Sequence, residues 1–180
     1  MFVSVQSYCH ISSIRAESLI LPTSLVGMMN DTFYRFIIDE YGDDIVSPLK
    51  KQLKENKNPP LGKCFSVETN KRGSISNLYF MLLLFKPNGS SSIYAIREGL
   101  KSSLNKALSD GVSSVAISGL CSNPLGVDTM SIAGIVFEET NKFKDNLDIY
   151  IVESDRVFVK EYYRLQDWLL NKESRDGSIR

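Results

Sequence analysis

Strands and helices alternate through the second half of the sequence. Short apolar runs at 112–118 and 147–154 read as strands, and helical spacing of apolar residues marks 91–109 and 128–143. One more helix carries its apolar side chains at Phe158, Tyr162, Leu165 and Leu169. A near-continuous apolar run is typical of a strand buried on both faces of a sheet. The alternation therefore predicts an α/β fold in three layers, α/β/α, around a mixed, mostly parallel sheet.

The first half of the chain adds further elements in a less regular order. Strands are predicted at 2–6, 18–24, 63–69 and 77–85, and helices at 31–41 and 45–55. The third and fourth of these strands are joined by a hairpin-like loop, and Gly42 is a natural stop for the first helix. We expect one domain over residues 1–170 and a flexible C-terminal tail over 171–180.

Composition and charge restrict the classes of partner. The chain has 180 residues, 43% hydrophobic and 23% charged, which is ordinary for a soluble globular protein. Lys plus Arg and Asp plus Glu both number 21, so there is no strong nucleic-acid signal. No apolar run approaches the ~20 residues of a membrane-spanning helix, and the N-terminus lacks the pattern of a signal peptide. We expect a cytoplasmic protein without a membrane partner.

Cysteine and histidine usage argues against metal and redox chemistry. Cys9, Cys64 and Cys121 are far apart and odd in number, which predicts reduced thiols. His10 is the only histidine, so a His-rich metal site is excluded and a His-based triad is disfavoured. A nucleophilic Cys121 would need His10 as its base, so we interpret Cys121 as a lining residue. No cofactor or metal is expected.

The strand at 112–118 ends in a polar loop that leads to a helix near Asp128 or Thr129. In parallel α/β sheets, ligands bind beyond the carboxyl ends of strands, where loops meet helix N-termini. Gly119 lets backbone N–H groups approach a ligand, and the helix adds partial positive charge. The pattern fits an anion site suited to a diphosphate, but many strand-to-helix loops contain Ser, Gly and Asn only to turn the chain. The candidate ligand residues here are Ser118, Gly119, Leu120, Cys121, Ser122 and Asn123.

Two other segments follow strands that end at the same predicted edge. At the end of the strand 18–24 and in the loop that follows it, the candidates for ligand contact are Thr23, Ser24, Gly27, Met28 and Asn30. The apolar members of this loop could instead plug into the core, and Asn30 or Asp31 could simply cap the next helix. Ser154 and Asp155 follow the last strand and could contact an adenosine moiety. Their alternative role is again a helix cap.

The order of these segments resembles a macro domain. Residues 9–24 look like the opening of that family, and helix 31–41 ending at Gly42 looks like its first helix. SGLCSNP at 118–124 is similar to its phosphate loop, and strand 147–153 with the following helix resembles its closing unit. The resemblance covers most of the chain. It implies the three-layer α/β/α fold and a ligand such as ADP-ribose or a related nucleotide.

The sequence departs from the family pattern at the residues that read adenine and support turnover. His10 stands where the family has an aspartate, and Ser24 falls near its asparagine. Gly27 is the only glycine left in the first loop, and Cys121 replaces an aromatic residue. The second loop keeps the Ser-Gly start and the proline. The resemblance therefore implies recognition of a diphosphate-containing, NAD-derived nucleotide without hydrolysis.

The resemblance also assigns roles and leaves two alternatives. It implies that the backbone of Gly119, Leu120, Cys121 and Ser122 donates to the diphosphate. Gly27 and Met28 would line the proximal ribose, and His10 would lie near the base. One alternative is a divergent ADP-ribosyl hydrolase with Ser24 or Asn30 orienting water. The other is a ligand-free protein-interaction scaffold. An ADP-ribosylated macromolecule is the further partner implied.

Overall fold

The computed structural model describes residues 2–6, 13, 15–27, 31–70, 75–86, 89–121 and 125–177. Within them, strands form one six-stranded sheet in the order β1-β6-β5-β2-β4-β3. The strands are β1 (Val3–Gln6), β2 (Ser18–Ser24), β3 (Cys64–Glu68), β4 (Asn77–Leu84), β5 (Ser114–Ser118) and β6 (Asp148–Val152). Only β3 and β4 pair antiparallel, and the other neighbours pair in parallel. The mixed, mostly parallel sheet predicted from the sequence is confirmed.

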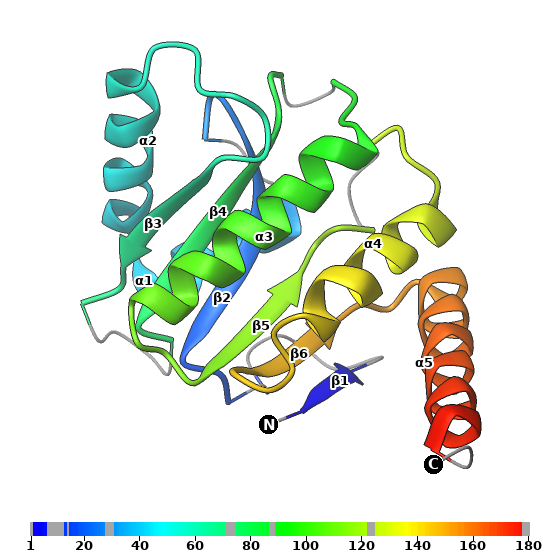
Figure 1. The fold of residues 1–180 in the computed structure, drawn as a ribbon. Coiled ribbons are helices and arrows are strands. Elements are labelled where there is room, and N and C mark those ends of the chain that lie inside the picture. The colour runs from blue at the N-terminus through cyan, green and yellow to red at the C-terminus, as the bar shows by residue number, and fades with distance from the viewer. Residues whose placement is uncertain are drawn as a thin grey trace.

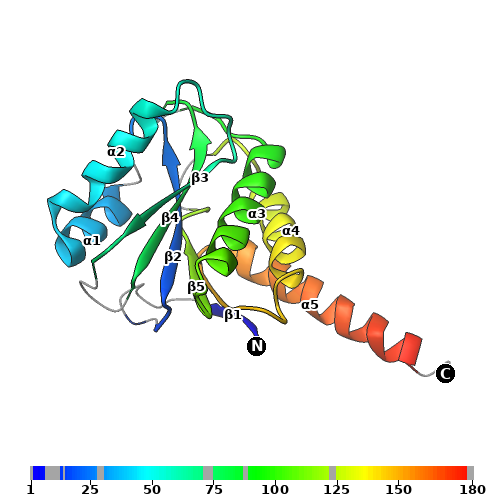
Figure 2. The same ribbon diagram turned by 60° about the vertical axis from the view of Figure 1, so that its left-hand side comes forward.

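Helices cover both faces of this sheet. They are α1 (Asp31–Tyr41), α2 (Val46–Glu55), α3 (Ile93–Ser109), α4 (Thr129–Asn141) and α5 (Arg156–Gly177), with a short 3-10 turn η2 (Asp43–Ile45) before α2. Figure 1 shows α3 crossing one face of the sheet, and Figure 2 shows α1 and α2 on the opposite side from α3 and α4. Helix α5 lies beside α4 and extends away from the sheet (Figure 2). The arrangement is the three-layer α/β/α architecture.

The apolar run of β4 explains why the sheet needs helices on both sides. Successive side chains of a strand point to opposite faces. Tyr79 and Met81 accordingly join the cluster under α3 and α4, whereas Phe80 and Leu82 join the cluster under α1 and α2. Both sets are fully buried. A strand that is apolar from its second residue onward thus requires two covering layers, and an interior place in the sheet follows from it.

Two elements differ from the sequence predictions at one end, and one predicted strand pairing is confirmed. The second helix starts as the 3-10 turn η2 and becomes α-helical only at Val46. The hairpin prediction for β3 and β4 is confirmed by their antiparallel register. Helix α5 runs to Gly177, into the segment predicted to be a tail. That segment is rich in Lys, Glu and Arg, which favour a helix even where no core contact supports it.

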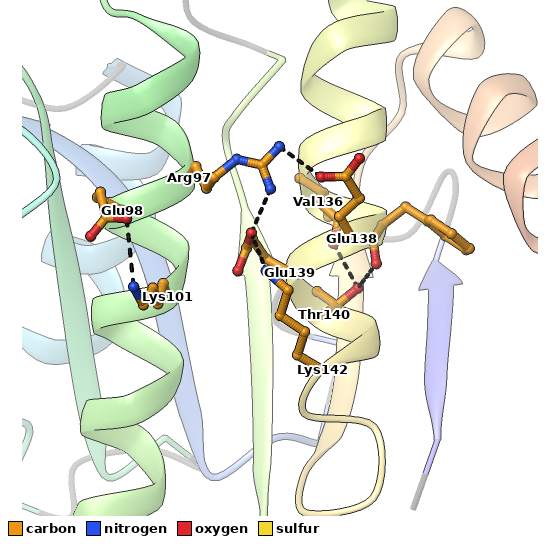
Figure 3. Close-up of polar contacts among 9 residues, drawn as sticks. Arg97, Glu98, Lys101, Val136, Glu138, Glu139, Thr140 and Lys142 are labelled. Carbon is orange, nitrogen blue, oxygen red and sulfur yellow. Dashed lines mark hydrogen bonds and ion pairs between the residues drawn. The ribbon is translucent and has the colours of Figure 1, made fainter.

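An ion-pair cluster joins α3 to α4 (Figure 3). Arg97 of α3 contacts Glu138 at 2.6 Å and Glu139 at 2.7 Å. Lys142 contacts the same Oε1 of Glu139 at 2.7 Å. Glu139 is completely buried, so these two cations supply the charge balance that its burial demands. Its other carboxylate oxygen is buried without a partner among the described residues.

Candidate functional site

The parallel strands β2, β5 and β6 end at the same edge of the sheet. The register pairs Ser118 of β5 with Val152 of β6, so the next residues, Gly119 and Glu153, leave the sheet side by side. Pairing between β2 and β5 stops at Ile20 opposite Ile117. The edge where the sequence placed the ligand loops therefore brings the loop after β5 against the residues after β6.

Ser118 and Gly119 fix how the chain leaves β5. The Ser118 hydroxyl donates to the carbonyl of Val152 at 3.0 Å and is buried. Gly119 has a φ of +83°, in the left-handed region that favours glycine over residues with a Cβ. The turn at Gly119 redirects the following amides toward β6. Ser118 thus closes the strand end, and its hydroxyl is turned into the protein.

The amides of the next two residues converge on one internal oxygen. The N–H groups of Leu120 and Cys121 donate to Oε1 of Glu153 at 2.8 Å and 3.3 Å. The Leu120 side chain is 1% exposed and belongs to the core cluster under α3 and α4, which anchors the backbone of the loop. The two amides that the sequence pattern assigned to a bound anion therefore already have a partner inside the protein, the carboxyl group of Glu153.

Burial makes Glu153 an unusual carboxyl group. It is 6% exposed, and loss of hydration raises its pKa to about 7. Hydrogen bonds from the backbone of Cys121, Leu120 and Gly119 act in the opposite direction, and the charge of Asp155 raises the pKa further. Burial outweighs the three backbone donors. Both the neutral and the ionised form are therefore populated near neutral pH.

Cys121 shares this environment and is a poor nucleophile. Burial raises the pKa of its thiol, and the negative charges of Glu153 and Asp155 raise it further. A thiolate is the reactive form of cysteine, and it is strongly disfavoured here. The arrangement agrees with the interpretation of Cys121 as a residue that lines the loop.

The first loop is turned inward at Thr23, Ser24 and Gly27, whereas Val26 is exposed. Thr23 and Ser24 are 2% and 0% exposed, and the Thr23 hydroxyl donates to the Ser24 carbonyl at 3.4 Å. The N–H of Gly27 donates to the same carbonyl at 2.9 Å. A Cβ on Gly27 would lie 3.4 Å from Cγ of Lys50 in α2. Gly27 therefore packs its backbone against α2.

Carboxylates already cap the two helices that begin near this edge. Asp128 accepts from the N–H of Ser131 at 2.9 Å at the start of α4. Asp155 accepts from the N–H groups of Val157 and Phe158 at 2.8 Å and 3.0 Å at the start of α5. The capping role anticipated for Asp155 is confirmed. Ser154 is exposed between Glu153 and this cap.

The remaining candidate residues fall outside the described part of the chain. They are His10, Met28, Asn30, Ser122 and Asn123. Among the described residues, no three His, Cys, Asp or Glu side chains gather as metal ligands. In the same residues, no helix has the length and apolar character needed to cross a membrane.

Glu153 is the residue that sequence reasoning missed. It lies within the run 147–154, whose apolar character predicts a strand and assigns no role to the glutamate. The available signal was its position, directly after a buried parallel strand at the edge where ligands bind. A cavity of about 530 Å³ lies at the other end of the sheet, beside Asn77 at the start of β4, and is separate from this site.

Known proteins are similar to this chain in structure rather than in sequence. No protein-family model matches the sequence, and no curated protein matches it. The macrodomain of Mycobacterium tuberculosis DarG aligns with a TM-score of 0.73 and 17% identity, covering 86% of this chain and 99% of that one. The Oceanobacillus iheyensis macrodomain with ADP aligns with a TM-score of 0.77 and 10% identity, covering 94% and 92%. The Trypanosoma brucei macrodomain aligns with a TM-score of 0.68 and 12% identity, covering 91% and 66%.

Proposed function

We propose that this chain, which has the macrodomain fold, binds ADP-ribose or a related diphosphate-containing nucleotide without hydrolysing it. The binding site would lie at the carboxyl edge of β2, β5 and β6. One observation carries the proposal: two successive amides, of Leu120 and Cys121, converge on a single anionic oxygen. Backbone N–H groups that converge in this way form a receptor for phosphate oxygens as well as for carboxylates.

The geometry of the loop supports a phosphate ligand over a positively charged one. Amides are donors only, and three of them, from Gly119, Leu120 and Cys121, already stabilise a negative charge at this place. The left-handed turn at Gly119 sets their direction. A diphosphate offers several acceptor oxygens to such donors and needs no lysine or arginine beside them.

The absence of hydrolysis is proposed from the chemistry of the described residues at this edge. Ser24, one of the two residues that the hydrolase alternative would use to orient water, is buried beneath the turn. Cys121 holds its thiol neutral, and Asp155 is engaged as a helix cap. Glu153 is the one strongly perturbed carboxyl group among them, and it faces the loop amides. We expect no release of ADP-ribose from an ADP-ribosylated protein.

The competing function is a ligand-free scaffold that binds protein. It is favoured by the same two hydrogen bonds, because amides occupied by Glu153 need no ligand to be satisfied. Titration calorimetry with ADP-ribose separates the two functions directly. Binding supports the nucleotide receptor, whereas no heat at millimolar ADP-ribose, at pH 6 and at pH 8, supports the scaffold.

A pair of glycine variants locates the binding. Gly119→Ala places a Cβ at a φ of +83°, and Gly111→Ala does the same at a φ of +74° in a turn before β5. Both variants carry a similar backbone cost of about 1 kcal/mol, and a Cβ at Gly111 meets no neighbour. We expect Gly119→Ala to weaken ADP-ribose binding by at least ~10-fold, about 1.4 kcal/mol, and Gly111→Ala to leave it unchanged. Equal affinities would place the ligand elsewhere.

A further inference from the structure

The Glu153 carboxylate occupies the position that the proposed function gives to a phosphate. Its Oε1 accepts both loop amides, at 2.8 Å from Leu120 and 3.3 Å from Cys121. These donors have fixed directions, because Leu120 is anchored in the core and Gly119 sets the turn. A phosphate oxygen and this carboxylate oxygen cannot take the same pair of N–H groups at once.

We propose that Glu153 is a built-in competitor of the nucleotide's diphosphate, holding the loop amides until it is protonated or displaced. The inference rests on the proposed function, since it names what the ligand must displace. It makes Glu153 a residue that determines affinity and its dependence on pH. The ionised carboxylate both occupies the donors and repels the incoming phosphates. A protonated carboxyl is a weaker acceptor and can itself donate to a phosphate oxygen.

The surroundings of Glu153 favour such competition. Beyond burial, two kinds of group act on its pKa from the described elements around it: the backbone amides of the loop lower the pKa, and the charge of Asp155 at the start of α5 raises it. The thiol of Cys121 also lies beside it, and the charge of Glu153 raises the pKa of that thiol. No Lys or Arg among the described residues contributes to its pKa, so only the backbone donors stabilise the ionised form. Gln6 of β1 pairs with Val152 on the other side of β6 and carries no charge. The carboxyl group therefore changes its charge at pH values near neutrality.

The test is titration calorimetry of the full 180-residue chain with ADP-ribose at pH 6 and pH 8, at one ionic strength. Each phosphate of ADP-ribose carries one ribose ester and one anhydride bond, and its single acidic group stays ionised over this range, so a change in affinity reports the protein. If only the protonated form of Glu153 releases the amides, the wild-type chain binds about 10-fold more tightly at pH 6 than at pH 8. Glu153→Gln removes the titrating group, and we expect it to bind equally at both values.

The matched control is Glu138→Gln, which makes the same change of charge on the exposed side of α4. We expect it to retain the wild-type dependence on pH. Wild-type affinity that is equal at pH 6 and pH 8 overturns the inference and leaves the proposed function standing. Loss of binding in Glu153→Gln alone also overturns it, because Glu153 would then support the ligand. No binding by any of the three proteins at either pH overturns the proposed function itself.

A second measurement needs no ligand and does not depend on the variant folding. The amide signals of Leu120 and Cys121 in a nitrogen–proton correlation spectrum of the wild-type chain report the group that they contact. We expect both to shift together with a midpoint near pH 7. Signals that stay constant from pH 5 to pH 9 would show that Glu153 keeps one charge state, and the inference would fail.

Discussion

Among the residues that the structure describes, two glutamates are buried almost completely, and their charges are stabilised in different ways. Glu139, between α3 and α4, is 0% exposed and contacts two cations, Arg97 and Lys142, each at 2.7 Å. Glu153, at the edge of the sheet, is 6% exposed, and its carboxylate accepts hydrogen bonds from the backbone amides of Leu120 and Cys121. Figure 3 shows the first arrangement, in which both cations approach one carboxylate oxygen.

The difference shows how the partner decides what a buried carboxylate can do. Full opposite charges hold an ion in place, and they tie two helices together at Glu139. Amide dipoles stabilise charge less strongly, so burial prevails at Glu153 and raises its pKa to about 7. The first glutamate is a fixed part of the helical layer. The second changes its charge near neutral pH.

The largest expected effect is the loss of stability when Glu139 loses one of its two cationic partners. Arg97→Met leaves its buried carboxylate with Lys142 alone and should lower the free energy of unfolding by about 3 kcal/mol. The control is Lys101→Met on the same helix, whose partner Glu98 lies 3.7 Å away and partly in solvent. That change should cost less than about 0.5 kcal/mol. Chemical denaturation measures both values, and equal losses would show that Glu139 is not held by Arg97.

The next effect concerns the pH dependence of stability. The folded-state pKa of Glu153 is raised from 4.5 to about 7, so the folded chain binds more protons than the unfolded chain between these values. Its contribution to stability is complete below the unfolded pKa and is lost as pH rises through 7. From pH 5 to pH 8, the wild-type chain should lose about 2 kcal/mol more than Glu153→Gln does.

Denaturation curves at several pH values measure that difference. The comparison between the two proteins removes the contribution of every other titrating group. Parallel curves for the wild-type chain and Glu153→Gln would mean that Glu153 has the same pKa folded and unfolded. Glu153 would then differ from Glu139 in its partners but not in titrating near neutral pH.

The third effect is on the rate at which the Cys121 thiol is alkylated. Burial and the charges of Glu153 and Asp155 raise the pKa of Cys121, so alkylation at pH 8 should be at least ~10-fold slower than for free cysteine. In Glu153→Gln the labelling should accelerate, because one repelling charge is gone. Mass spectrometry of the peptide that contains Cys121 measures the rate. Cys64 serves as the internal reference, because burial raises the pKa of its thiol to about 11. Its labelling rate should be the same in the wild-type chain and in Glu153→Gln.

The smallest effect is expected at the cap of α5. Asp155→Ala removes the acceptor for two helix amides and should cost about 1 kcal/mol of stability. Asp155→Asn keeps a capping side chain but removes the charge that raises the pKa of Glu153. It should leave stability nearly unchanged and move the titration of the Leu120 amide to lower pH. If Asp155→Ala moves the titration and Asp155→Asn does not, loss of the cap rather than of the charge is responsible.

Much of the fold could be predicted because its causes are local. The run SLILPTS is apolar at the positions that a doubly buried strand requires, and β2 spans those residues, Ser18–Ser24. Asp128 has the side chain that helix N-termini favour, and α4 begins directly after it. The end of α5 was harder, because exposed helix-forming residues look like an ordinary polar tail.

The candidate site was only partly predictable, because its key contact is not local. The turn at Gly119 follows from the glycine itself. The bond from Leu120 to Glu153 joins residues 33 positions apart, and it depends on the register that sets Ser118 beside Val152. Periodicity shows that both segments are strands but does not show which residues end level with each other. The burial of Glu153 depends on this register, so the periodicity of the sequence could not predict it.

Helix α5 carries the chain's single tryptophan, Trp168, which is 56% exposed and has the ammonium of Lys172 5.5 Å from the centre of its ring. The fluorescence of this indole will therefore report the hydration of α5, and it will respond little to changes in the hydrophobic core. A fluorescence melt followed at this chromophore would register fraying of α5. Circular dichroism or tyrosine signals are needed to see the sheet come apart, and disagreement between the two kinds of probe would measure how independently α5 unfolds.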